Sequence, residues 1–182
     1  MAPHLRLTLL ALMLTLTAPI GAALHAQEPD SALSEAEIEH LRDDAYFPAT
    51  RVLTFMQFLD DRLKALDKLT AGKRKPGRED DIHDLMEQFT SIANDLDDNL
   101  DDYSRRHRDI RKSLPNLISA TERWSTELKT PPDHPTYNVS RKLALEAVAD
   151  LHEFATKMVE EQKAWFQAHP PPKDDPNRPQ SR

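Results

Sequence analysis

One long stretch of the chain, from Glu79 to Lys129, constrains the fold most strongly. Apolar and aromatic side chains recur along it in steps of three or four residues or their sums, which is the spacing of one helix face. His107 and Thr121 fill the two gaps in this stripe. The stripe consists of Ile82, Leu85, Phe89, Ile92, Leu96, Leu100, Tyr103, Ile110, Leu114, Leu117, Trp124 and Leu128. The pattern predicts a long amphipathic helix in a bundle.

Pro115 lies inside this stretch and leaves two interpretations open. A chain reversal near it would divide the stretch into two helices and give a four-helix bundle. We favour a kinked continuous helix, because the apolar stripe stays in phase across the proline and no glycine- or asparagine-rich turn supplies a reversal. At 1.5 Å per residue, such a helix would be about 75 Å long.

A second helical stripe precedes this stretch and begins at a capping-box pattern, Ser34-Glu-Ala-Glu37. It predicts a helix over roughly 34–70. Pro48 lies inside it, so we expect a bend near Tyr46-Phe47-Pro48, because proline lacks an amide and clashes with the preceding turn. The loop Ala71–Arg78 follows, with two glycines and a proline that permit a reversal.

A proline-rich connector over 130–137 precedes the last predicted helix, which runs to about Ala168. Asn138 or Ser140 is the expected cap of this helix. Only three glycines occur in the chain, which disfavours a β-rich fold with many turns. The predicted fold is therefore all-α: an antiparallel bundle of three long helices over 27–168, with a kinked central helix. The alternative is a four-helix bundle broken at Pro115.

The first 26 residues read as a secretory signal peptide. Arg6 precedes an apolar run, Pro19 and Gly21 break the run, and Ala26 is suited to cleavage. The run is too short for a membrane span, which needs about 20 residues. We expect an exported protein, periplasmic or secreted in a bacterium, with a disordered proline-rich tail over 169–182.

The overall composition excludes several kinds of partner and chemistry. The net charge of −7 argues against nucleic acid, whose phosphates would be repelled. The absence of cysteine excludes disulfides and thiolate chemistry. The basic residues of the 71–78 loop suit the carbonyl end of the preceding helix, so membrane association is not expected.

Tyr103 and His107 are the most interesting site candidates, because they occupy positions in the apolar stripe. Antiparallel pairing would bring Tyr46 and Arg42 towards them from the first helix, and Glu160 and Trp165 from the last. One interpretation is a hydrogen-bonded layer that fixes the register of the helices. The other is a small ligand pocket in the middle of the bundle, formed by Tyr46, Tyr103, His107 and Glu160.

No metal, cofactor or catalytic residue is expected. Glu37-Ile-Glu-His40 and Asp80-Asp-Ile-His83 have ligand-like spacing, but each lies in a first helical turn among solvated acids. The aspartates between 95 and 102 are expected to form a solvated face rather than a calcium site. Neither a nucleophile motif nor a glycine-rich phosphate loop is present.

Charge is segregated along the central stretch, with only acids over 79–102 and mainly basic residues over 105–112. This pattern suits association with a protein partner or with another copy of the chain. We therefore expect a non-enzymatic protein of the bacterial envelope that acts through such contacts. The alternative is a small-molecule- or metal-binding bundle around Tyr103 and His107.

Three runs, DLMEQFTSIANDLDDNLDDYSRRHRDIRKSLP, TERWSTELKTPPD and YNVSRKLALEA, carry a resemblance to known proteins. The chain resembles a group of small, exported, all-helical bacterial proteins of uncharacterised function. The resemblance covers most of the chain after the leader. It implies export and a helical fold, and it brings no activity or site residues to carry over.

Overall fold

The computed structural model describes residues 32–170, and every regular element in that range is a helix. The expected signal peptide over 1–26 and nearly all of the expected tail over 169–182 lie outside the described residues. The elements are α1 (Glu35–Asp43), the 3-10 helix η1 (Asp44–Tyr46), α2 (Pro48–Ala71), α3 (Arg78–Arg105), α4 (Leu114–Glu127) and α5 (Asn138–Ala168). The all-α prediction is confirmed for this part of the chain.

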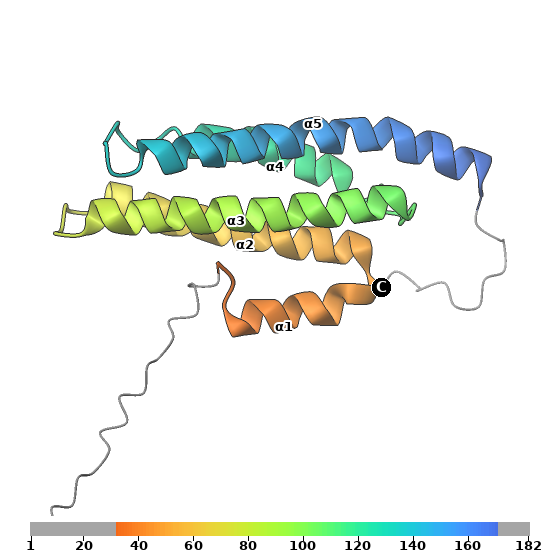
Figure 1. Cartoon of the computed structure of the whole chain (residues 1–182), viewed down its shortest axis with the longest axis horizontal. Coiled ribbons are helices and arrows are strands. Elements are labelled where there is room, and N and C mark those ends of the chain that lie inside the picture. The colour runs from red at the N-terminus through yellow and green to blue at the C-terminus, as the bar shows by residue number, and fades with distance from the viewer. Residues whose placement is uncertain (1–31, 171–182) are drawn as a thin grey trace, which may run out of the picture. The chain divides into compact units, whose positions relative to one another are not determined.

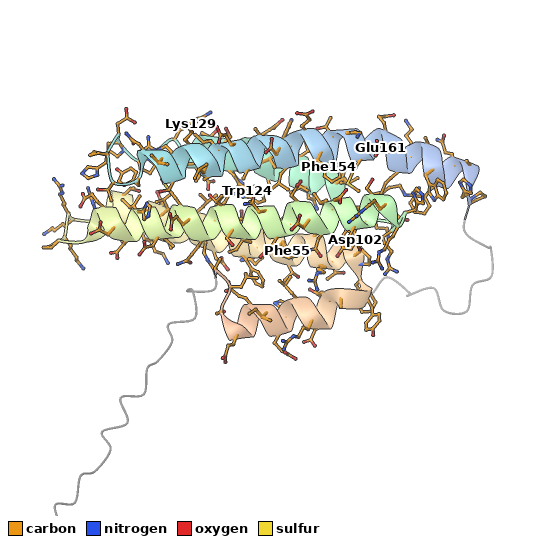
Figure 2. The ribbon with its side chains drawn as sticks, viewed as in Figure 1. Phe55, Asp102, Trp124, Lys129, Phe154 and Glu161 are labelled. Atoms are coloured by element: carbon orange, nitrogen blue, oxygen red, sulfur yellow. The ribbon has the colours of Figure 1, made fainter. Side chains whose placement is uncertain are left out.

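The four longer helices lie side by side (Figure 1). α3 packs between α2 and α5, α4 packs against α5 and α2, and α1 lies along α2. Each helix from α2 to α5 runs opposite in direction to the one before it (Figure 1). The end of α3, the start of α4 and the end of α5 therefore share one end of the bundle, where Asp102 and Glu161 are labelled in Figure 2.

The single long helix predicted over Glu79–Lys129 is not confirmed. α3 ends at Arg105, and α4 starts at Leu114 after a reversing loop. Pro115 lies in the first turn of α4, where a missing amide costs no helical hydrogen bond, so it marks a helix start rather than a kink. The three-helix arrangement is not confirmed either, and the break falls just ahead of Pro115.

Pro48 has the same role at the start of α2. The first predicted helix is therefore two helices, with η1 between them, rather than one bent helix. The capping box at Ser34 is confirmed, since the hydroxyl accepts from the Glu37 amide at 3.3 Å and the Glu37 carboxylate accepts from the Ser34 amide at 2.8 Å. Gly77, with φ of 83°, ends the α2–α3 loop in a left-handed conformation that favours glycine.

The expected cap of the last helix is wrong in detail. Tyr137 precedes α5 and makes no side-chain cap. Asn138 instead accepts from the backbone amide of His134 at 3.0 Å, which orders the connector. Ser140 is turned into the bundle, where its hydroxyl lies 2.6 Å from His83 Nδ1 of α3. The Asn138 side chain thus bonds to the connector, and no side chain caps the first turn of α5.

The core lies between α2, α3, α4 and α5, and its largest fully buried side chain is Trp124 of α4. The indole edge packs against Phe89 of α3, with ring centroids 5.8 Å apart. Its Nε1 donates to Asp60 of α2 at 2.6 Å, and Asp60 also accepts from Arg123 at 2.8 Å. Trp124 therefore ties α4 to both α2 and α3.

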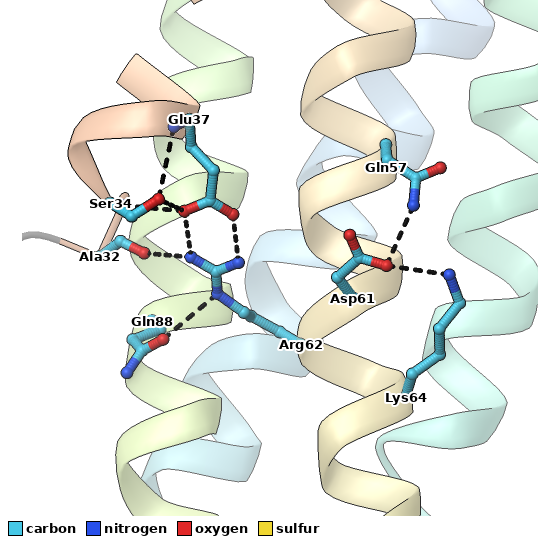
Figure 3. Close-up of polar contacts among 8 residues, drawn as sticks. All are labelled: Ala32, Ser34, Glu37, Gln57, Asp61, Arg62, Lys64 and Gln88. Atoms are coloured by element: carbon cyan, nitrogen blue, oxygen red, sulfur yellow. Dashed lines mark hydrogen bonds and ion pairs between the residues drawn. The ribbon is translucent and has the colours of Figure 1, made fainter. Parts of the chain in front are cut away.

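A polar cluster around Arg62 of α2 ties α1 to the bundle (Figure 3). Its guanidinium donates to the Glu37 carboxylate at 2.9 Å, to the Ala32 carbonyl at 2.6 Å and to Gln88 of α3 at 3.2 Å. This ion pair, together with the capping-box bonds, lowers the pKa of Glu37 from its usual 4.5 to about 2. A single residue on α2 thus joins α1 and α3.

Candidate binding cleft at the end of the bundle

α3 ends in a left-handed cap formed by His107, whose φ is 51°. The His107 amide donates to the Ser104 carbonyl at 3.2 Å, and the Arg108 amide donates to the Tyr103 carbonyl at 2.9 Å. These two bonds are the Schellman pattern, in which a left-handed residue just past the helix satisfies its last carbonyls. The reversal that seemed to lack a glycine is thus made by a histidine.

The cap places the His107 imidazole against α5. It stacks on Trp165 with ring centroids 3.5 Å apart and an interplanar angle of 9°. His169 also stacks on Trp165, at 3.8 Å and 18°, and its Nδ1 lies 3.1 Å from the Trp165 carbonyl oxygen. His107 and Trp165 meet as expected, but they do so at one end of the bundle rather than in a mid-bundle layer, because α5 runs parallel to α3.

Gln162 of α5 holds the loop between α3 and α4 in place. Its side-chain oxygen accepts from the Ile110 amide at 3.1 Å, and its nitrogen donates to the Arg108 carbonyl at 2.8 Å. The side chain is buried, and Ile110 beside it is fully buried. Sequence reasoning missed Gln162, although it continues the inward face of α5 four residues beyond Met158.

A cleft of about 370 Å³ opens beside this loop. Its lining is mostly apolar and consists of Ser104, His107, Glu161, Gln162, Ala164, Trp165 and Phe166. The guanidinium of Arg111 lies 4.3 Å from the centre of the Phe166 ring, a cation–π contact. Arg111 also forms a two-bond ion pair with Asp109, at 2.7 and 2.9 Å, which lowers the pKa of that carboxyl. The cleft thus has aromatic walls and a cationic rim.

The other predicted site residues do not join the cleft. Tyr103 is buried in the core, with its hydroxyl 3.4 Å from Asn99 Oδ1, and burial raises the pKa of the phenol. Tyr46 is 83 % exposed on η1, and Glu160 is exposed on α5. Arg42 pairs with Glu39 of its own helix at 2.8 Å. The four-residue pocket is not assembled, and ligand binding by these residues stays a prediction.

A Ser–His–Glu chain lies near the opposite end of the bundle and has the order of a hydrolytic triad. Ser140 lies 2.6 Å from His83 Nδ1, and His83 Nε2 lies 3.2 Å from Glu87. The Ser140 residue is only 2 % exposed, however, and no described cleft opens on it. Thr121, 1 % exposed and 2.8 Å from His152 Nδ1, is a similar pair between α4 and α5. Both pairs fix the packing of α5.

Asp95 and Asp97 of α3 form no ion pair with any described residue. Burial raises the pKa of both carboxyls, with repulsion from Asp98 adding to each and from Asp150 of α5 adding at Asp97. Within residues 32–170, no group of three or more histidines and acids is arranged to hold a metal ion. On α3, partial burial of Asp95 and Asp97 thus raises the pKa of their carboxyls more than repulsion does, whereas Asp101 and Asp102 are in ion pairs with Arg105 and Arg106.

Within the part of the chain that the structure describes, no helix combines the length and apolar character needed to cross a membrane. No protein-family model matches the chain, and neither do the curated proteins or the solved structures compared with it.

Proposed function

We propose that this chain is a non-enzymatic, exported protein of the bacterial envelope that acts through contact with a protein partner or a second copy of itself. The contact surface, here called the aromatic end, comprises residues 46–47, 104–112 and 161–169. The single observation that carries the proposal is the exposure of aromatic side chains at this end. Tyr46 is 83 % exposed and Phe47 46 % exposed, and Trp165 and Phe166 are half-buried.

Large exposed aromatic groups beside arginines are typical of protein interfaces, where Trp, Tyr and Arg contribute most of the binding energy. Burying such a ring against a partner removes apolar area from water at about 25 cal/mol per Å². The same rings contribute little to the bundle core while they remain in water. Contact with another protein surface accounts for their position better than internal packing does.

The polar groups of the cleft also favour a protein partner over a small molecule. Both amide atoms of Gln162 are already bonded to the α3–α4 loop, and Arg111 is bonded to Asp109. A small-molecule site usually offers a few free polar atoms that converge on the ligand. The exposed lining of this cleft is mostly apolar, so a side chain inserted by a partner would meet chiefly aromatic faces rather than its few polar groups.

The proposal can be tested by placing a photo-crosslinking amino acid at Phe166 and irradiating intact cells. A matched control carries the same amino acid at Ala149, an exposed position on α5 away from the aromatic end. We expect a discrete crosslinked species from position 166 and none from position 149, and mass spectrometry would identify it. Purified protein that is strictly monomeric, together with no crosslink at position 166, would contradict the proposal.

A second candidate function is small-molecule binding in the cleft, because about 370 Å³ lies within the range of ligand pockets. In that case Trp165→Ala, which removes the wall of the cleft, should abolish binding of the compound while helix content is retained. Screening a compound collection by thermal shift of the purified protein, followed by Trp165→Ala on any compound found, decides between the two candidates. A protein crosslink at position 166 with no compound found favours the first.

A further inference from the structure

We propose that the partner of the aromatic end is an acidic protein segment that places an apolar side chain in the cleft. This inference rests on the proposed function, since it names the chemistry of the partner at the same surface. It is carried by the charges of the α3–α4 loop and by their position around the cleft.

The loop segment 105–112 contains five basic residues and one acidic residue. Three of the arginines are neutralised locally: Arg105 by Asp101 at 3.0 Å, Arg106 by Asp102 at 2.7 Å, and Arg111 by Asp109. Arg108 and Lys112 are exposed and form no ion pair with any described residue. Two cations are therefore available to a partner.

Both cations belong to the loop that runs beside the cleft. The Arg108 carbonyl is bonded to Gln162, which lines the cleft, and Lys112 follows Arg111, whose guanidinium lies over Phe166. A carboxylate held by Arg108 or Lys112 would keep its neighbouring side chain next to the aromatic walls. The arrangement combines charge attraction, which speeds association and selects partners, with apolar burial, which supplies affinity.

The positive region is small and bounded by acids, which favours a peptide segment over an extended polyanion. Asp101, Asp102 and Glu161, each already in an ion pair, lie on the helices next to it, and the chain as a whole has a net charge of −7. A membrane surface or a nucleic acid would extend well beyond Arg108 and Lys112 and would meet the net negative charge of the rest of the chain. A short acidic segment can contact the loop alone.

The test uses two fluorescent peptides, one rich in glutamate with a single central leucine and one with each glutamate replaced by glutamine. Binding to the purified protein is followed by fluorescence anisotropy. The test variant is Arg108→Glu with Lys112→Glu. The control is Lys73→Glu with Lys75→Glu, which makes the same charge change at two exposed lysines, free of ion pairs to described residues, in the loop at the other end.

We expect the glutamate peptide to bind and the glutamine peptide to bind much more weakly. Reversing two charges next to the bound peptide should weaken binding about tenfold, whereas the control should change it less than about twofold. Replacing the central leucine by serine should also weaken binding. Equal binding of both peptides, equal loss in both variants, or binding to anionic vesicles with none to the peptide would each overturn the inference.

The crosslink at position 166 separates this inference from the proposed function. If the crosslink is lost in Arg108→Glu/Lys112→Glu and retained in Lys73→Glu/Lys75→Glu, the proposed function and this inference are both supported. If the crosslink forms equally in both variants, a partner exists but is not recognised by its acidity, and only this inference fails. If position 166 gives no crosslink in the chain without these charge changes, and the purified protein is strictly monomeric, the proposed function itself fails.

Discussion

His107 occupies the position where a helix with this cap most often has glycine. A non-glycine residue in the left-handed region costs roughly 1–2 kcal/mol, because its Cβ approaches the following carbonyl oxygen. The imidazole offsets part of this cost by stacking on Trp165. The residue thus links the reversal of the chain to the formation of the cleft.

Two substitutions separate these roles. His107→Gly removes both the stacking and the backbone strain, whereas His107→Ala removes the stacking and keeps the strain. We expect His107→Gly to be more stable than His107→Ala by about 1 kcal/mol. Urea unfolding with unchanged slope measures the difference. An alanine variant as stable as the glycine variant would show that the cap is not left-handed.

Gln162 is the second residue on which the loop depends. Gln162→Leu keeps a similar volume but leaves the Ile110 amide and the Arg108 carbonyl without partners. An unsatisfied buried group costs about 1–3 kcal/mol, so we expect a loss of about 2 kcal/mol, because water can reach part of the loop. The matched control is Gln57→Leu at an exposed position of α2, which should change the unfolding free energy by less than about 0.5 kcal/mol. Similar losses in both would refute the role of Gln162.

At the scale of elements, the apolar periodicity correctly predicted which segments are helical. The prolines and glycines of the sequence were a poorer guide to where each helix begins and ends. Pro48 and Pro115 both begin helices, yet the sequence suggested a bend at one and a kink at the other. The stripe stays in phase across 106–113 because Ile110 and Leu114 are both buried in the core, so phase alone cannot reveal a reversal. The approach of Trp165 to His107 was predicted, whereas Gln162 was missed: its place on the inward face of α5 can be read from the sequence, but its partners in the α3–α4 loop cannot.

The attachment of α1 should depend on pH through Glu37. Its pKa is about 2 in the folded state and 4.5 ordinarily, so its contribution is present above pH 4.5 and is lost as the pH falls towards 2. We expect the contribution of Glu37 to stability to fall by about 2 kcal/mol over this range. This is less than the full difference in pKa implies, because the carboxylate is partly exposed and water screens the ion pair. The protection factors of the α1 amides at pH 7 and pH 3, which are exchange rates corrected for the intrinsic rate at each pH, measure this loss. In Glu37→Gln, protection of α1 should be low at both pH values, and a variant that retains the difference in protection would contradict the role of Glu37.

At the scale of the described bundle, side-chain contacts fix how α5 lies along α3. Ser140 meets His83 near the start of both helices, and Gln162 meets Ile110 just beyond the end of α3. α5 therefore runs parallel to α3. Since the connector returns from α4 directly to the start of α5, α4 must run antiparallel to both. This path requires that α3 and α4 be separate helices.

The reversal can be measured directly, because the chain has no native cysteine. Spin labels at Asp80→Cys and Lys129→Cys, both exposed, would lie about 75 Å apart along one continuous helix. In the folded arrangement the start of α3 and the end of α4, next to which these positions fall, lie at the same end of the bundle (Figure 1). α3 and α4 both pack on α2 and on α5, and the axes of each packed pair are 8–10 Å apart, so we expect a label separation below about 30 Å. Asp80→Cys with Asp101→Cys serves as a ruler within α3 and should give about 32 Å for either arrangement. An 80–129 distance longer than this ruler would overturn the reversal at His107, and with it the cleft that the reversal creates.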